Sequence, residues 1–496
     1  MKRFACIFTV YAALFFCANS FASVSIGADE SKIAVEVYVS SSAGDDSNDG
    51  SKSKPFKTFS KIPRKNARIF LKRGDVFYEP LSGLENCVVD SYPNNGKRLP
   101  VICGLRFIKN PSAWENMGGG IWRLDMNADA NFSGRNPPAA TRGNLFNNIG
   151  GIYDASSDTL HGRVLKKHSD LKDNWDMISS PEFRKDKVTD QTFRYLYLKL
   201  DENPAKYGDS LALMTYGNGV SNIRNCTVRN IAIKGFGRHG LTGCSGGKIE
   251  NLEIDLIGGS VLVGFPNWVR LGNGIEFWIS GGPNSNIHNR VSNCTISRTF
   301  DCGSTIQGRT DNGNALALDI VFTGNKYYRC RQAFEHWLAS SGNGPIEYRD
   351  CKFVRNFAWE MGENEFDSPY LQDLNFLTYD RGVAAMTIRE NVCYGAGAYT
   401  GIPNWSTDFG DNTFYVLRGK PLVAVLRGSG NIVVNAESDA DIEKYRQITG
   451  DKTSKIFIVE KDDSALRDKL LNGDFKYVRK FLNKKTIIKG RVNELN

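Results

Sequence analysis

The sequence lacks the patterns by which common metal and nucleotide sites are recognised. It contains only five histidines and no Cys-x-x-Cys pair, so a zinc site is not expected. No Gly-Lys-Ser/Thr sequence follows the glycine-rich stretch 237–247, which argues against a phosphate-binding loop. We therefore expect neither a metal nor a cofactor.

Long apolar runs are also absent, except at the N-terminus. Residues 1–22 contain Lys2 and Arg3, an apolar run and a small-x-small end at Ala22, which together predict a cleaved signal peptide. Lipidation at Cys17 is an alternative, although bulky phenylalanines precede this cysteine. No later run is long enough to span a bilayer, so we expect a secreted or periplasmic protein without a membrane span.

Disulfides are not expected either, although the sequence has 11 cysteines. Cys6 and Cys17 fall within the predicted signal peptide, and the cysteines that remain are odd in number, so no complete disulfide framework explains them. The formal charge is +9, of which Lys2 and Arg3 leave with the signal peptide. In an exported protein this excess suits an anionic polysaccharide better than a nucleic acid, or it reflects only a solvated surface.

The sequence does contain a repeated pattern of six residues. Its third residue is Asn or Asp, and its first, fourth and sixth residues are apolar or Cys. Copies occur at 223–228, 249–254, 291–296, 348–353 and, more loosely, at 388–393. Their spacing fits coils of roughly 25 to 30 residues with inserted loops, which is typical of solenoids. Asn and Asp suit the left-handed corners that such coils need.

Alternation within each copy predicts which side chains fill the interior of a coil. The expected interior pairs are Cys226/Val228, Leu252/Ile254, Cys294/Ile296 and Cys351/Phe353. Cysteines at such positions behave as small buried hydrophobes. An odd number of cysteines is then compatible with the fold, because none of them has to pair.

The N-terminal region carries a more specific pattern. An alternating segment at 35–40 is followed by an acidic turn-rich loop at 44–50, Pro-Phe-Lys-Thr at 55–58 and Lys-Arg-Gly-Asp at 72–75. This succession resembles the start of secreted pectate-lyase-like proteins, and the similarity covers most of residues 33–400. The resemblance implies an all-β fold, a right-handed single-stranded parallel β-helix with inserted loops and a short C-terminal appendage. The same scaffold hosts polysaccharide lyases, glycoside hydrolases, epimerases and non-catalytic proteins.

The pattern divides the chain into three parts. We assign residues 1–22 to the signal peptide, 23–400 to the β-helix with its N-terminal strand and loops, and 401–496 to the final coils, a cap and a Lys-rich appendage. Residues 100–215 are less regular, and we interpret them as early coils that carry long loops. The segment 258–289 is expected to be a loop insert, a kind of segment that often carries function.

A candidate site is obtained when four segments are superposed without gaps: Gly274–Trp278, Gly303–Gln307, Ala333–Trp337 and Ala358–Gly362. The superposition predicts one outer row of Glu276, Thr305, Glu335 and Glu360, and a second row of Trp278, Gln307 and Trp337. Carboxylates can transfer protons, and flat indoles pack against sugar rings. Coils about 4.8 Å apart would separate Glu335 from Glu360 by about 5 Å, and Glu276 from Glu335 by about 9.6 Å. The alternative is a solvated ladder of polar side chains.

Further polar residues accompany these rows. Asp301, in the coil that follows Glu276, either orients water or a neighbouring acid or is a turn residue. Arg238 and His239 lie about one coil before Glu276 and are candidates for contact with an anionic sugar. His336 falls on the inner face and is expected to be a core histidine.

These residues favour a secreted glycoside hydrolase that acts on a polysaccharide. Glu276 and Glu335 are the expected acid and base or nucleophile, and Asp301 assists them. The expected substrate contacts are Trp278, Trp337, Gln307, Glu360, Arg238 and His239.

Two alternatives stay open. The first is a polysaccharide lyase that cleaves a uronic-acid polymer by β-elimination. For a lyase, the resemblance implies a Lys or Arg base and calcium-binding acids, but no comparable pair stands out except Arg238 or Arg331. The second alternative is a non-catalytic protein that binds or assembles a glycan.

Overall fold

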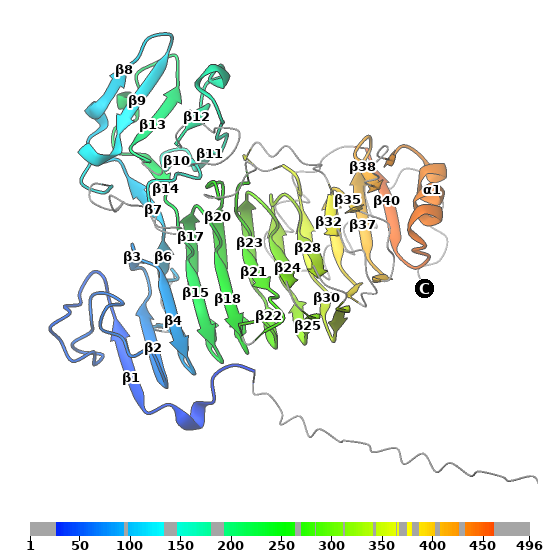
Figure 1. The fold of residues 1–496 in the computed structure, drawn as a ribbon, viewed down its shortest axis with the longest axis horizontal. Coiled ribbons are helices and arrows are strands. Elements are labelled where there is room, and N and C mark those ends of the chain that lie inside the picture. The colour runs from blue at the N-terminus through cyan, green and yellow to red at the C-terminus, as the bar shows by residue number, and fades with distance from the viewer. Residues whose placement is uncertain are drawn as a thin grey trace, which may run out of the picture.

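The computed structural model describes residues 26–460, apart from residues 94–97, 133–145, 180–192, 263–268, 283, 311–312, 341–343, 364, 367–373, 379–385, 402–406 and 426–431. The predicted signal peptide and the Lys-rich end at 461–489 lie outside these residues. In the part described, the fold is all-β and is built around three ten-stranded sheets, called A, B and C below (Figure 1).

The three sheets have the following strands. Sheet A contains β1 (Val35–Val39), β2 (Ala67–Lys72), β5 (Val88–Tyr92), β16 (Thr227–Arg229), β19 (Lys248–Glu250), β22 (Asn289–Ser292), β26 (Ile320–Thr323), β30 (Lys352–Val354), β33 (Thr387–Arg389) and β36 (Asp408–Gly410). Sheet B contains β4 (Leu81–Glu85), β15 (Val220–Arg224), β18 (Leu241–Ser245), β21 (Ile275–Trp278), β24 (Ser304–Thr310), β28 (Phe334–Ser340), β32 (Leu374–Thr378), β35 (Gly397–Gly401), β38 (Pro421–Val425) and β39 (Ile432–Asn435). Sheet C contains β3 (Val76–Phe77), β6 (Val101–Cys103), β17 (Ala232–Phe236), β20 (Glu253–Ile257), β23 (Thr295–Thr299), β27 (Lys326–Tyr328), β31 (Phe357–Trp359), β34 (Val392–Gly395), β37 (Thr413–Leu417) and β40 (Lys455–Val459).

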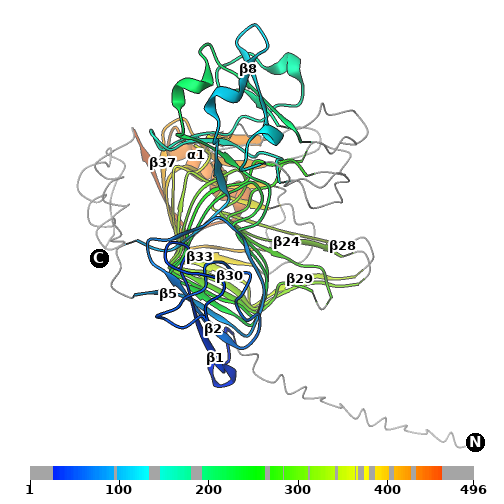
Figure 2. The same ribbon diagram turned by 90° about the vertical axis from the view of Figure 1, so that its left-hand side faces the viewer.

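From β15 to β38 the chain visits the sheets in the repeating order B, A, C. Each strand of these coils pairs in parallel with its counterpart in the next coil, for example β21 with β24 and β24 with β28. Figure 2, which looks along the stack, shows successive coils superimposed around one interior. This arrangement is consistent with a parallel β-helix, whereas the right-handed sense of the coil is still an expectation from the resemblance.

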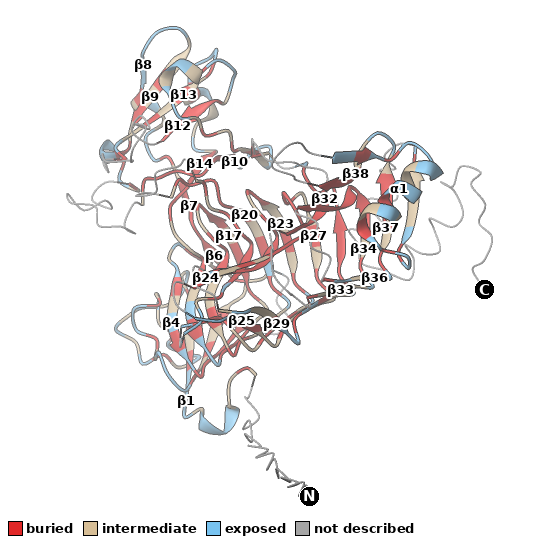
Figure 3. Cartoon of the chain, turned by 45° about the vertical axis from the view of Figure 1, so that its right-hand side comes forward, coloured by how far each residue is buried: buried red, intermediate tan, exposed pale blue. Residues whose placement is uncertain are grey.

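A continuous apolar core fills the stack and includes residues from Val37 to Tyr445. The interior pairs expected from alternation are all buried in it: Cys226/Val228, Leu252/Ile254, Cys294/Ile296 and Cys351/Phe353. Every cysteine in the described part of the chain is free and buried, which confirms that these thiols act as small core residues. Figure 3 shows buried residues along the length of the stack, with exposed residues around α1 and on the loops of the inserted unit.

The corners of the coils take the left-handed conformation that the sequence predicts. Asn225, Asn251, Asn293, Asp350 and Glu390 have φ angles between 49° and 57°. Directly after such corners, four buried asparagines form a ladder: Asn325, Asn356, Asn391 and Asn412. In each step the backbone and side-chain N–H groups of one asparagine donate to Oδ1 of the next, at 2.9 to 3.2 Å. The ladder satisfies polar groups inside the stack.

The predicted coil length is wrong in part, because the repeated sequence pattern marks two different corners. Asn225 lies between β15 and β16, where the chain turns from sheet B to sheet A, whereas Asn251 lies between β19 and β20, where it turns from A to C. In sheet A, Thr227 pairs with Lys248, and Lys248 pairs with Arg290. The length of a coil therefore varies about twofold. Both corners need a left-handed residue, so similar sequences occur twice in one coil.

Residues 105–214 form an inserted unit of their own, and the prediction of irregular early coils is wrong here. One antiparallel sheet contains β7 (Leu105–Phe107), β10 (Ile152–Asp154), β11 (Thr159–His161) and β14 (Leu211–Met214), and another contains β8 (Trp114–Asn116), β9 (Ile121–Asp125), β12 (Met177–Ile178) and β13 (Tyr195–Lys199). Trp114 and Trp122 pack in a separate core within this unit. Antiparallel strands pair locally, so the unit needs no repeat in its sequence.

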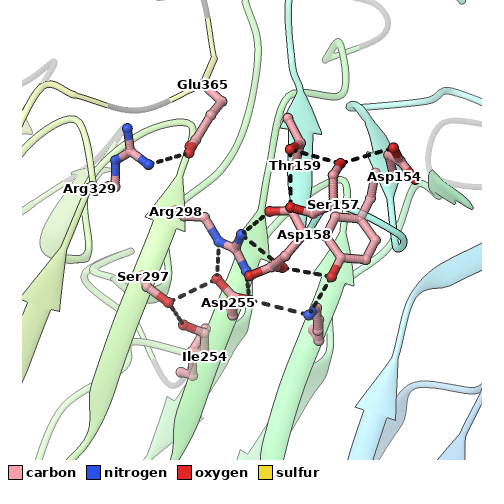
Figure 4. A network of polar contacts seen from close by, with 12 residues as sticks. Asp154, Ser157, Asp158, Thr159, Ile254, Asp255, Ser297, Arg298, Arg329 and Glu365 are labelled. Atoms are coloured by element: carbon pink, nitrogen blue, oxygen red, sulfur yellow. Dashed lines mark hydrogen bonds and ion pairs between the residues drawn. The ribbon is translucent and has the colours of Figure 1, made fainter. Parts of the chain in front are cut away.

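A polar network binds the inserted unit to the outer face of sheet C (Figure 4). Arg298 of β23 donates from Nε to Asp255 of β20 at 2.8 Å and from an Nη group to Asp158 of the inserted unit at 3.2 Å. Asp158 also accepts the hydroxyl of Tyr153 at 2.7 Å, and the Lys234 ammonium lies 4.7 Å from the centre of the Tyr153 ring. The unit is therefore anchored to the stack by charged groups.

The stack closes with a change of strand direction. β38 pairs with β39 in antiparallel fashion, the helix α1 (Asp439–Thr449) follows, and β40 returns to sheet C. Beside β24 and β28, β25 (Ala315–Leu318) and β29 (Ile346–Arg349) form a small parallel pair. Short 3-10 helices are η1 (Glu30–Lys32), η2 (Pro111–Ala113), η3 (Met126–Ala128), η4 (His168–Asp170) and η5 (Pro204–Tyr207). No helix in the described ranges has the length and apolar character needed to cross a bilayer.

Candidate active site

Three neighbouring strands of sheet B carry the candidate carboxylates. Glu276 of β21 is in register with Thr305 of β24, which is in register with Glu335 of β28. The residues beside them in these strands lie in the core: Ile275, Phe277, Ile306 and Phe334. Alternation therefore turns the Glu276 row outward, as predicted, and two strand spacings separate the glutamates by about 9.6 Å.

The next row of the same face is aromatic. Trp278, Gln307 and Trp337 are in register on the same three strands. The rings of Trp278 and Trp337 meet at 86° with their centroids 5.9 Å apart. Trp278 is 37% exposed, whereas Trp337 is half-buried. Two indoles thus stand beside the carboxylate row, two residues further along the strands.

Glu360 does not belong to this row, so the fourth segment of the superposition was placed wrongly. It follows β31, which pairs with β27 and β34 in sheet C. In β31, Ala358 faces the core, whereas Trp359 stacks on Tyr328 at a centroid distance of 4.9 Å. Glu360 itself is a corner residue with a φ of 52°, and its carboxylate lies 3.7 Å from Arg329 Nε. The gapless superposition assigned residues 358–362 to the sheet B row, but because coil length varies, this segment lies in sheet C.

The Glu335 carboxyl lies in a dry environment that contains a second acid. Glu335 is 4% exposed, and its Oε2 lies 3.7 Å from Cys302 Sγ and 3.5 Å from Thr305 Oγ1. Burial and the nearby charge of Asp301 raise the pKa of Glu335 to about 8, although the charge of Arg331 acts in the opposite direction. Glu335 is therefore protonated at neutral pH, which is the state that a proton donor needs.

Asp301 supplies the charge beside Glu335. It lies at the corner between β23 and β24, where it is partly exposed and forms an ion pair with the buried Arg331. Arg331 also approaches Cys302 Sγ, at 3.8 Å. Asp301 thus contributes to the electrostatics of Glu335, and its part in the chemistry stays a prediction.

The same residues include a group of atoms that has the spacing of metal ligands. Ligand atoms of Asp301, Cys302 and Glu335 lie within 4.8 Å of one another. In this group Asp301 is already paired with the Arg331 guanidinium, whose positive charge opposes a cation in the same place. We therefore assign no metal to this group.

Hydrogen-bond donors surround the carboxylate of Glu276, which is 8% exposed. Its Oε1 accepts the hydroxyl of Thr242 at 2.9 Å. Its Oε2 accepts Nε2 of Gln307 at 2.7 Å and Nδ2 of Asn273 at 3.4 Å. The nearest ring nitrogen of His239 lies 3.6 Å from the same oxygen. These contacts hold the carboxylate in one orientation.

Of the two side chains predicted to contact an anionic sugar, the structure brings His239 into the site and stacks Arg238 on an aromatic ring. Burial lowers the pKa of His239, against the opposing charge of Glu276, so that the imidazole is neutral. The Arg238 guanidinium lies over the ring of Tyr216, 5.2 Å from its centroid. His336 is fully buried and its Nε2 lies 2.9 Å from a tyrosine hydroxyl, which confirms the prediction of a core histidine.

Three residues that contact the carboxylates escaped the sequence prediction: Thr242, Asn273 and Cys302. Asn273 and Cys302, with Gln332 in the next coil, stand two residues before β21, β24 and β28 respectively. Extending the gapless superposition by one residue toward the N-terminus aligns Asn273, Cys302 and Gln332, so the sequence did contain a signal for Asn273 and Cys302. Thr242 has no comparable signal, because residues 258–274 separate β20 from β21 between Thr242 and Glu276. The predicted insert 258–289 is too long, since β21 (Ile275–Trp278) lies within it as a strand of sheet B.

Comparison with known proteins gives only distant similarities. No protein family and no curated protein matches the sequence. Among solved structures, the complex of XylC with xylose aligns over 85% of this chain and 82% of its own, at 11% identity and a TM-score of 0.40. The GH136 lacto-N-biosidase from Eubacterium ramulus aligns over 86% and 68%, at 13% identity and a TM-score of 0.38. A structure described as a glycoside hydrolase aligns over 77% and 96%, at 10% identity and a TM-score of 0.30.

Proposed function

We propose that the protein is a secreted glycoside hydrolase that cleaves a polysaccharide by acid–base catalysis. The main support is a pair of glutamates that lie in different environments on one sheet face. Glu335 has a pKa raised to about 8 by burial and by Asp301, whereas Glu276 accepts hydrogen bonds from three side chains. Glycosidic cleavage uses one protonated and one ionised carboxyl group, and this difference in environment suits that division of labour.

In this proposal Glu335 protonates the glycosidic oxygen, and Glu276 takes a proton from the attacking water. Two strand spacings place the backbones of the two glutamates about 9.6 Å apart, just above the roughly 6.5 to 9.5 Å that separates the carboxyl groups of inverting enzymes. In such enzymes a water molecule fits between the base and the sugar. Inversion at the anomeric carbon is therefore the expected stereochemistry, and NMR of the initial product tests it.

The substrate in this proposal is a polysaccharide whose sugar rings pack against Trp278 and Trp337. Indole faces offer flat apolar contacts of the kind that sugar rings use. The formal charge of +9 on the whole chain suits an acidic glycan, for which Arg238 stays a candidate contact. Glu360 is not part of this proposal, because it faces Arg329 at a corner of sheet C.

Lyase chemistry receives no specific support from the described residues. Of the two candidate lyase bases, Arg331 is buried and paired with Asp301, and the Arg238 guanidinium lies over the ring of Tyr216. A lyase and a non-catalytic binding protein are therefore treated as outcomes of the test.

The test is a product assay of the full-length protein on a panel of neutral and acidic polysaccharides. New reducing ends and the ultraviolet absorbance of unsaturated uronates are read together. The proposal expects reducing ends without the absorbance, and no effect of a calcium chelator. Absorbance that grows with the reducing ends would indicate β-elimination, and binding without product on every polymer would indicate a non-catalytic protein; either result overturns the proposal.

A further inference from the structure

A chain of hydrogen bonds connects the aromatic wall of the site to one of its carboxylates. The indole Nε1–H of Trp337 donates to Gln307 Oε1 at 2.8 Å, and Gln307 Nε2 donates to Glu276 Oε2 at 2.7 Å. The three side chains come from the adjacent strands β28, β24 and β21. Gln307 and Glu276 are buried, so water competes little for these bonds and each bond is stronger than it would be on the surface.

The direction of each bond in this chain is fixed by groups that can only donate. An indole N–H has no acceptor atom, so the amide oxygen of Gln307 has to face Trp337. The amide nitrogen of Gln307 then faces Glu276, and an NH2 group also can only donate. Oε2 of Glu276 must therefore act as an acceptor toward Gln307.

A second branch reaches the same oxygen from the corner before β21. The backbone N–H of Cys302 donates to Asn273 Oδ1 at 3.1 Å, which turns the Asn273 amide nitrogen toward Glu276 Oε2 at 3.4 Å. His239 Nδ1 accepts the backbone N–H of Asn273 at 3.2 Å, so the neutral imidazole carries its proton on Nε2. This Nε2 lies 3.6 Å from the same oxygen.

The two oxygens of Glu276 therefore have different surroundings. Three N–H groups converge on Oε2, from Gln307, Asn273 and His239. Within the described residues, Oε1 has one hydrogen-bond partner, the hydroxyl of Thr242 at 2.9 Å. Oε2 is thus the anchored oxygen, and Oε1 is the one that retains capacity to accept a further proton.

We propose that Trp337 and Gln307 are positioning residues that hold Glu276 with Oε1 presented for proton transfer. This inference rests on the proposed glycosidase function. Trp337 then has two roles, because its ring face packs against a sugar and its N–H fixes the Gln307 amide. A sugar that packs on Trp337 stabilises the orientation of Glu276. Gln307, expected from the sequence to contact substrate, uses its amide within the protein instead.

The first test replaces Trp337 by Phe, which keeps an apolar ring and removes the N–H. Trp278→Phe is the matched control, because the indole N–H of Trp278 has no partner within the described ranges. Trp337→Phe is expected to lower kcat by about 10-fold to 30-fold with a KM within about threefold of the parent. Trp278→Phe is expected to act mainly by raising KM. Equal effects of the two variants on kcat would overturn the inference.

The second test is a double-mutant cycle with Gln307→Met, a substitution of similar length without donor or acceptor. If the chain acts as one unit, Trp337→Phe lowers kcat less than about threefold further once Gln307 has been replaced. Losses that multiply in the double variant would show two independent contributions, and would contradict the inference.

A readout that is independent of catalysis separates this inference from the proposed function. In protein labelled with 15N at tryptophan, the indole hydrogen of Trp337 should exchange with solvent at least about 10-fold more slowly than that of Trp278, and Gln307→Met should remove this protection. Equal exchange rates would refute the hydrogen-bonded chain even in an active enzyme. A protein that cleaves no glycan but shows the protection would refute the proposed function and, with it, the role of the chain in positioning a catalytic base.

Discussion

The outer faces of sheets B and C present similar residue types in very different surroundings. On sheet B, Glu335 lies beside the charge of Asp301, and its pKa is raised to about 8. At a corner of sheet C, Glu360 lies 3.7 Å from Arg329 Nε, next to a stack of aromatic rings that includes Trp359 and Tyr328. Both glutamates are buried, but one faces a like charge and the other an opposite charge.

This difference shows why a Glu-and-Trp pattern alone does not identify a site in this fold. From β15 to β38 every coil contributes one strand to each sheet, and side chains alternate between the interior and the exterior of the coil. The function of a glutamate depends on the sheet that receives it and on the charge beside it. Like charge and burial favour the neutral form that a general acid needs, whereas an opposite charge favours a structural ion pair.

The largest expected difference between the two faces is in catalysis. Glu335→Gln removes the proton donor and should lower kcat on the polysaccharide by about 1,000-fold, within the range for loss of a general acid. Glu360→Gln, a matched change at a buried glutamate of sheet C, should leave kcat within about twofold. The measurement is reducing-end release at saturating substrate. Similar losses in both variants would remove the distinction between the two faces.

The pH profile tests the electrostatics of the sheet B face. A raised carboxyl pKa means that the active, protonated form of Glu335 is present below about pH 8 and is lost as the pH rises through that value. We expect kcat to fall about 10-fold per pH unit above pH 8. A profile that is already falling between pH 4 and 5, as an ordinary glutamic acid would give, contradicts the assigned environment.

Asp301→Asn tests the same environment of Glu335 and should have a smaller effect on kcat than Glu335→Gln. The substitution removes the like charge beside Glu335 and the negative charge that offsets the Arg331 guanidinium, and both changes favour the ionised form of Glu335. The alkaline limb of the kcat profile should therefore move to lower pH by about one unit or more. An alkaline limb that stays in place would show that burial alone raises the pKa of Glu335.

The smallest expected effect on activity comes from the asparagine ladder, which lies at the corner between sheets A and C. Asn356→Ala removes the Oδ1 atom that accepts the backbone and side-chain N–H groups of Asn325, and it removes the side-chain N–H that donates to the carbonyl of Phe322. Stability should fall by about 3 kcal/mol, because buried polar groups lose their partners. Calorimetry should show a lower Tm with an unchanged pH profile. A shifted profile would couple the ladder to the site.

The repetitive part of the fold could be predicted because its signals are local. Left-handed Asn and Asp residues mark corners, and alternation identifies the interior, including Cys294 and Cys351. The inserted unit could not be predicted in the same way. Its strands have two to five residues and pair antiparallel, so neither a repeat nor a long alternating run marks them.

The candidate site was likewise predictable in part. Glu276 and Glu335 were placed in the correct register because a small residue, Gly274 or Ala333, stands directly before the sheet B strand and two positions before each glutamate. Glu360 was misplaced because coil length varies, so a gapless superposition assigned a sheet C strand to sheet B. The contact of His239 with Glu276 depends on how two segments 37 residues apart in the sequence come together, which spacing along the sequence does not reveal.

The most direct test of the central claim compares two substrates in Glu335→Gln and Glu276→Gln. An aryl glycoside of the released sugar has a leaving group that needs little protonation, so it bypasses the acid but not the base. Glu335→Gln should keep aryl glycoside cleavage within about 10-fold of the parent while losing about 1,000-fold on the polysaccharide, and Glu276→Gln should lose both activities. Equal losses on both substrates in Glu335→Gln would contradict its assignment as the proton donor on the outer face of sheet B.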